Sequence, residues 1–113
     1  MRKIKLGRIL SVALAVFFLA GALGNLLGPD AIIEEYQRWG YPVWFRFVTG
    51  TLELTTAWLL IRPRRQIFGV LLGSAEMTAA LLTLLIHGEF LHALAPVAVL
   101  MLLPLILILK KTS

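Results

Sequence analysis

Two glutamates at the centres of apolar segments are the residues in this sequence best placed to do chemistry. Glu53 lies in the segment 43–61 and Glu76 in the segment 67–86. If both segments are helices that cross a bilayer, both carboxyl groups lie about 15 Å deep, near the midplane. A charged acid at that depth costs about 2.5 to 3.5 kcal/mol on insertion scales. We therefore expect both side chains to face the protein interior and not lipid.

Residues at steps of three and four from the two acids are small or polar, which places a polar stripe on each helix. Such a pair of stripes predicts a crevice that binds a ligand or a partner helix. The predicted binding residues are Arg46, Thr49, Gly50, Glu53, Thr56, Glu76, Thr83 and His87. Gly69 and Gly73 form a G-x-x-x-G pair, which permits close helix packing and predicts a homo-oligomer.

Three interpretations of the acids remain open from their positions alone. Two neutral acids could simply bond across helices, because a low dielectric disfavours the charged form. The available partners are Thr49, Thr56, Thr83 and Asn25. If the acids lie close together, they share one proton and serve a ligand or proton-handling site. Alternatively, they mark an interface with another membrane protein.

His87, Glu89 and His92 cluster between two apolar segments, and a metal site there would need convergent ligands. The spacing matches no metal-binding motif, so we predict a solvated loop and no metal. The chain has no cysteine, which excludes disulfides and thiolate chemistry.

The composition predicts a membrane protein. The chain of 113 residues is 59% hydrophobic and 15% charged, with a mean hydropathy of +0.88. A soluble domain this small exposes too much surface to hide that apolar content. The net charge of +5 does not indicate nucleic-acid binding, because the basic residues lie at the ends of apolar segments.

We predict one all-α transmembrane domain over 1–113, an integral membrane four-helix bundle with both termini cytoplasmic. The expected spans are 9–27, 43–61, 67–86 and 93–109, and an amphipathic segment over 30–39 lies on the outer side. Asp30 is expected to cap that segment, and Pro42 to occupy the first position of the next helix. The residues 1–27 also resemble a secretory signal peptide, but we favour a retained first span.

The orientation follows from charge. All of the 11 lysines and arginines except Arg38 and Arg46 fall on one side of the expected bundle. Positive residues stay cytoplasmic, so the cell membrane, as a bacterial inner membrane, is the expected location. The basic residues on this side are Arg2, Lys3, Lys5, Arg8, Arg62, Arg64, Arg65, Lys110 and Lys111.

The sequence resembles the DoxX-like family of small four-helix membrane proteins. The resemblance runs from Gly24 to about Pro96. It is carried by RWGYPVWFRFVTGTLEL over 38–54, Arg62-Pro63-Arg64, Gly69, the region 76–80 and His87-Gly88. It implies the bundle and marks Glu53 as a position to test. Some members are named as subunits of a thiosulfate:quinone oxidoreductase or as partners in oxidative-stress complexes, and related eukaryotic proteins act in receptor assembly or cargo export.

Our favoured function is an accessory membrane protein whose crevice binds a lipid-like ligand or a partner membrane protein, without a cofactor. The alternative is the membrane subunit of a quinone-linked oxidoreductase, for which quinone would be the cofactor. A proton-coupled transporter is a third hypothesis. No haem ligand pair, flavin fingerprint or iron–sulfur motif occurs, so we do not expect the isolated chain to be a complete enzyme.

Overall fold

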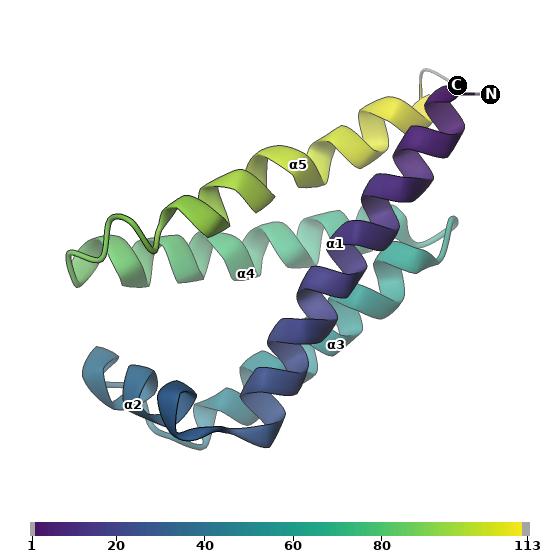
Figure 1. Ribbon diagram of the computed structural model, residues 1–113. Helices are drawn as coiled ribbons and strands as arrows, with labels where there is room; N and C mark the ends of the chain where they lie inside the picture. The colour runs from purple at the N-terminus through teal and green to yellow at the C-terminus, as the bar shows by residue number, and fades with distance from the viewer. Residues whose placement is uncertain (1, 112–113) are drawn as a thin grey trace.

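The computed structural model describes the backbone of residues 2–111 and the side chains of residues 6–110. This part of the chain is all-helical and contains no strand, as predicted (Figure 1). The helices are α1 (Arg2–Leu27), α2 (Asp30–Trp39), α3 (Phe45–Ile61), α4 (Gln66–Ile86) and α5 (Leu94–Lys111). The predicted segments each coincide with one helix to within two residues, except that α1 begins earlier, at Arg2.

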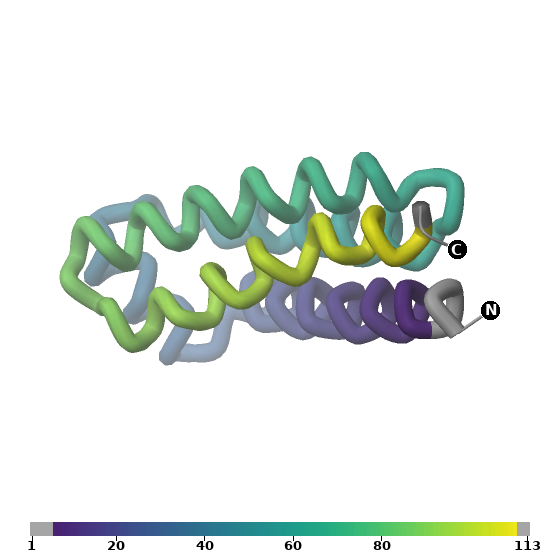
Figure 2. Tube along the Cα trace, turned by 90° about the horizontal axis from the view of Figure 1, so that it is seen from above, coloured from purple at the N-terminus to yellow at the C-terminus, as the bar shows by residue number. Residues whose placement is uncertain are grey.

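The long helices pack in a closed circuit. α1 contacts α3 and α5, and α4 contacts the same two helices. The start of α1 lies beside the end of α5, as Figures 1 and 2 show from two directions. Gly7 marks this close approach, because a Cβ there would lie 3.4 Å from the Cβ of Leu109. We call this end of the molecule the terminal end, and the end that carries α2 the α2 end.

The most deeply buried side chains come from α1, α3 and α5. Phe18, Leu60, Leu103 and Ile106 are almost completely enclosed. Gly73 lies among them, since a Cβ there would be 3.0 Å from the Phe18 ring and 3.2 Å from Leu103. The glycine lets α4 approach the other helices closely here, because it has no side chain.

Two local predictions at helix starts were wrong. Asp30 was expected to cap α2, but Pro29 holds the capping position and no side chain caps the helix. Asp30 instead lies in the first turn, where its charge favours the positive end of the helix. Pro42 was expected inside the first turn of α3, but its carbonyl accepts from the amide of Phe45, 3.0 Å away, in a turn before the helix. The turn displaces the start of α3 to Phe45.

Two helices are long and apolar enough to cross a bilayer: Leu6–Leu27 and Gln66–Ile86. In the 18-residue stretch of highest hydropathy, only 28% of the first helix and 33% of the second is buried inside the protein. A helix in the core of a soluble protein would be mostly enclosed. The stretch Leu94–Lys110 is apolar but shorter, and α3 has 17 residues.

Candidate functional site

Glu53 points from α3 towards α1 and is only 7% exposed. Its Oε1 accepts a hydrogen bond from Nδ2 of Asn25, at 2.6 Å. The carboxyl group fits here because α1 has a glycine opposite it: a Cβ at Gly21 would overlap the carboxyl group of Glu53. A small residue on one helix thus makes room for an acid on the other.

Asn25 joins three helices in one polar cluster. Its Nδ2 also donates to the carbonyl of Gly21, at 3.0 Å, and its Oδ1 accepts from the hydroxyl of Tyr36 in α2, at 2.7 Å. Burial raises the pKa of the Tyr36 hydroxyl, which keeps that hydroxyl protonated as a donor. We call Asn25, Tyr36 and Glu53 the Asn25 cluster.

Glu76 points from α4 towards α3, where Oγ1 of Thr56 contacts its Oε2. Thr56 is fully buried, and its hydroxyl lies 3.0 Å from the carbonyl of Leu52 as well. The Thr56 hydroxyl therefore shares its hydrogen between the Leu52 carbonyl and Oε2 of Glu76, as a three-centre hydrogen bond. The other oxygen of Glu76, Oε1, is enclosed and has no hydrogen-bond partner among the described residues.

The two acids therefore have different partners. Glu53 is held by α1 and Glu76 by α3, and no hydrogen bond links their carboxyl groups in the described part of the chain. They are near enough for Glu76 to act electrostatically on Glu53. Both acids turn inward, as expected. The sequence suggested that they share a proton, but no hydrogen bond joins the two described carboxyl groups.

Arg46 has a structural partner that the sequence did not indicate. Its Nη1 donates to the carbonyls of Asn25 and Leu26, at 2.8 and 3.0 Å. These carbonyls belong to the last turn of α1, where the helix dipole favours a cation. A Cβ at Gly28 would overlap the guanidinium, so this glycine leaves room for Arg46. Arg46 thus fixes the end of α1 and is not paired with Glu53.

The remaining predicted residues fall into two groups. Thr49 and Gly50 lie on α3 near the α1 contact: Thr49 bonds to the carbonyl of Phe45, and a Cβ at Gly50 would press on Leu26. Thr83 and His87 lie near the end of α4, where the Thr83 hydroxyl is 2.7 Å from that of Tyr41. Of the eight predicted residues, the structure therefore gathers Glu53, Thr56 and Glu76 at the centre and places the others around them.

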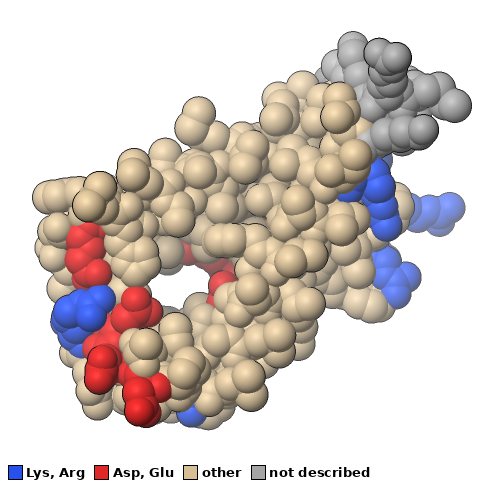
Figure 3. Space-filling view, viewed as in Figure 1, with Lys and Arg blue, Asp and Glu red and all other residues tan. Residues whose placement is uncertain are grey.

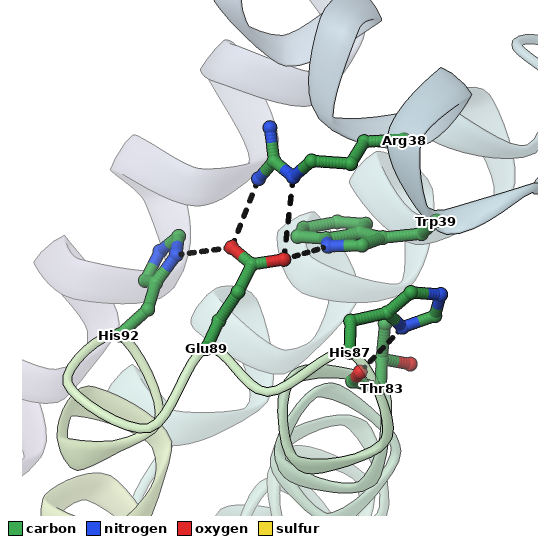
Figure 4. A network of polar contacts seen from close by, with 6 residues as sticks. All are labelled: Arg38, Trp39, Thr83, His87, Glu89 and His92. Carbon is green, nitrogen blue, oxygen red and sulfur yellow. Dashed lines mark hydrogen bonds and ion pairs between the residues drawn. The ribbon is translucent and has the colours of Figure 1, made fainter.

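Glu89 ties α2 to the connection between α4 and α5 (Figure 4). Its carboxylate accepts hydrogen bonds from Arg38 Nη2 at 2.9 Å and Nε at 3.3 Å, and another from Trp39 Nε1 at 2.7 Å. His92 Nδ1 lies 3.5 Å from the same carboxylate. Together with the Tyr41–Thr83 contact, these bonds hold α2 against the last turn of α4 and the connection between α4 and α5.

The two histidines do not converge with Glu89 on a metal. His87 turns its Nδ1 to the carbonyl of Thr83, 2.8 Å away, while His92 faces the carboxylate, as Figure 4 shows. No group of three metal-ligating side chains occurs among the described residues. The loop is better explained by the tie to α2.

The hydrogen bonds from Arg38, and then that from Trp39, lower the pKa of Glu89 to about 2. A carboxylate with a depressed pKa stabilises the fold above its unfolded pKa of about 4.3 and loses that effect as the pH falls through the folded value. We expect Glu89→Gln to be less stable than the parent by a constant amount from neutral pH to about pH 5. The difference should disappear between about pH 4 and pH 2. Thermal unfolding of both proteins in detergent across this pH range measures the difference in stability. A difference that vanished by pH 6 would contradict the stabilising role of the Glu89 hydrogen bonds.

Several residues of the site were not singled out by the sequence. Asn25 was named only as one of several bonding partners, although it is the single asparagine of the chain and lies in an apolar segment. That position was the available signal, because an amide in lipid needs a partner. Arg38, Trp39 and Tyr41 carried no such signal, since polar and aromatic residues are common at a membrane surface.

An opening separates the two sides of the molecule towards the α2 end. Figure 3 shows it in the space-filling view, between α4 and the side formed by α1, α2 and α3. Acidic side chains border part of the opening in this view. The bonds of Glu89 and Tyr41 bridge the same two sides. The helices are therefore tightly packed at the terminal end and spread apart towards α2.

The family of the chain follows from its residues 9–106, which match the model of the DoxX-like family. The chain belongs to the DoxX-like family. The resemblance noted in the sequence is confirmed and extends over nearly all of the described helices. The family and the two apolar helices together identify this DoxX-like protein as a membrane protein.

One curated relative of this DoxX-like protein is the uncharacterized protein YdgD of Bacillus subtilis (strain 168). The two are 39% identical over 49 residues, which are 43% of this chain and 43% of the relative. The match thus spans less than half the length of either protein. No solved structure matches this DoxX-like protein.

Proposed function

We propose that this DoxX-like protein spans the bacterial inner membrane with α1, α3, α4 and α5, both termini being cytoplasmic. The terminal end carries Arg8, Arg62, Arg64, Arg65 and Lys110, which fits the cytoplasmic side. The side chains of Arg2, Lys3, Lys5 and Lys111 were predicted on the same side and lie outside the described residues. Large apolar side chains on every long helix are exposed and suit contact with acyl chains; they include Val16, Leu71, Leu82 and Met101.

We propose that the opening between α4 and the α1–α3 side is a crevice that takes a lipid-like ligand, in an accessory or assembly role. The observation that supports this proposal is the buried Oε1 of Glu76, which has no hydrogen-bond partner among the described residues. The other carboxyl oxygen of Glu76 is bonded to Thr56. A buried acceptor without a partner costs about 1 to 3 kcal/mol. A hydroxyl or amine on a ligand headgroup would supply the missing donor, while its apolar tail lies against the exposed helix faces.

The experiment compares molecules that co-purify with the full chain and its variants in mild detergent, by mass spectrometry of the extract. Glu76→Gln and Glu53→Gln keep the shape of each side chain and replace one carboxyl oxygen by an NH2 group, which donates hydrogen bonds and does not accept them. We expect up to about a tenfold lower yield of the retained molecule from Glu76→Gln, since a hydrogen bond contributes up to about 1.5 kcal/mol. We expect a smaller loss from Glu53→Gln, because Asn25 already occupies its carboxyl group.

Glu34→Gln is the matched control, because it removes an exposed acid on α2, a different helix from those that carry Glu53 and Glu76. Equal recovery from all three variants and the parent would refute the crevice. Recovery of a quinone would favour the redox subunit instead, and loss of a co-purified protein from Glu76→Gln would favour a partner helix as the occupant.

A further inference from the structure

The terminal end of the molecule carries positive charge without any acidic residue to balance it. The six acidic residues of the chain are Asp30, Glu34, Glu35, Glu53, Glu76 and Glu89, so none lies in 1–29, 54–75 or 90–113. Figure 3 shows Lys and Arg atoms at this end and no Asp or Glu atoms beside them. An anion that approaches this end therefore meets no aspartate or glutamate side chain.

A pocket of about 170 Å³ lies at this end, among α1, the α3–α4 turn, α4 and α5. Arg8 and Lys110 are the two cations that line it, and both are exposed. Gly7, Gln66 and Ile106 form its buried part, and Pro63 completes it. Two positive groups thus stand over a concave surface built by four separate segments.

The two cations are fixed in place by neighbouring carbonyls of one turn. Arg8 Nη1 donates to the carbonyl of Ile61 at 2.8 Å, and Lys110 Nζ donates to the carbonyl of Pro63. A guanidinium has five N–H donors and an ammonium has three, so each keeps donors for an anion. In the part of the chain that the structure describes, neither cation pairs with a carboxylate.

We propose that this pocket binds the phosphate group of an anionic phospholipid headgroup. Basic pockets between membrane helices on the cytoplasmic side are suited to such headgroups, because the phosphate lies at the level of the helix ends. A phosphate oxygen accepts charge-assisted bonds from a guanidinium and an ammonium together. The site lies away from Glu53 and Glu76, and it does not depend on what occupies the crevice.

The test is native mass spectrometry of the full chain exchanged into mixed micelles that contain phosphatidylglycerol or phosphatidylcholine. High salt is used so that general surface attraction is screened. The parent should retain phosphatidylglycerol and not phosphatidylcholine. Arg8→Gln combined with Lys110→Gln should weaken phosphatidylglycerol binding by roughly 100-fold, about tenfold for each cation. Arg8→Lys and Lys110→Arg keep the charges and should each stay within about threefold of the parent.

The matched control combines Arg64→Gln with Arg65→Gln. It removes the same charge from the same end, but neither residue lines the pocket. We expect it to bind phosphatidylglycerol within about threefold of the parent under screening salt. Equal losses in the two double variants would overturn the site, because general attraction would then explain the binding. Saturation by inorganic phosphate, without preference between the two lipids, would overturn the lipid and make a soluble phosphate the ligand.

Discussion

Replacement of Gly73 by leucine is expected to destabilise the folded protein by about 3 kcal/mol or more. A Cβ at this position would lie 3.0 Å from the Phe18 ring, 3.1 Å from Thr56 Cγ2 and 3.2 Å from Leu103 Cδ1. Phe18, Thr56 and Leu103 belong to three other helices and are completely buried. The added side chain cannot be accommodated by the movement of one neighbour, because all three sides of the site are occupied. Unfolding in detergent, followed by helix content, measures the loss.

Gly24→Leu is the control for this prediction, because a Cβ at Gly24 meets no atom within 4 Å. Gly24 is also helical, so the change to leucine should be neutral or slightly stabilising through helix propensity. If the two variants were equally stable, the close packing of α4 at Gly73 would be wrong. The same comparison also tests the arrangement of α1, α3 and α5 around α4.

Asn25→Leu is expected to cost about 2 to 3 kcal/mol, the largest effect of any single change in the polar cluster. The substitution removes the donor to Glu53 and the acceptor for Tyr36 together. It leaves the carboxyl group of Glu53 buried without a donor from α1, and an unpaired buried acceptor costs more than a lost bond. Unfolding of the purified variants in the same detergent measures the change.

Tyr36→Phe provides the comparison, since it removes the bond to Asn25 but leaves the bond from Asn25 to Glu53, and it should cost about 1 kcal/mol. Thr78→Val changes an exposed hydroxyl that bonds within its own helix, and should lie within about 0.5 kcal/mol of the parent. The double variant Asn25→Leu with Glu53→Leu should be more stable than the sum of the two single changes, because neither group is then left unpaired. An Asn25→Leu cost no larger than that of Tyr36→Phe would argue against Asn25 as the joining residue.

The different settings of Glu53 and Glu76 bear on the proposed crevice. Glu53 is almost fully enclosed and is held by Asn25. Glu76 is only half-buried and keeps one oxygen without a partner. We therefore assign the structural task to Glu53 and propose Glu76 as the group that meets a ligand. The tie at Glu89 holds α2 across the same side of the molecule, so it would influence access to the crevice.

The glycine pair on α4 packs helices closely, as predicted, and the helices it meets belong to the same chain. Gly69 and Gly73 were predicted to pack helices closely and, through that, to form a homo-oligomer. In the structure Gly69 lies against Leu60, and Gly73 lies among Phe18, Thr56 and Leu103 of the same chain. These glycines are used inside the protein. The prediction of a homo-oligomer remains untested and no longer has this face to support it.

The sequence by itself determined the helices and the central position of the two acids within them. Apolar segments of fixed length, with Gly28, Gly40 and Gly88 at their boundaries, set the helix limits to within two residues, apart from the earlier start of α1. These features depend on residues that are close in the sequence, and local physical rules are sufficient for them. The same rules placed Glu53 and Glu76 near the middle of their helices.

Only the tertiary structure decided which group each polar side chain meets. Asn25 with Glu53, Arg46 with the end of α1, and Arg38 with Glu89 are all pairs of residues that are distant in the sequence. Their meeting depends on the rotation of each helix about its own axis and on where glycines permit close approach. Helical periodicity gives the face on which a residue lies, but it does not give the neighbour of that face, because the neighbour is chosen by the packing of the whole chain.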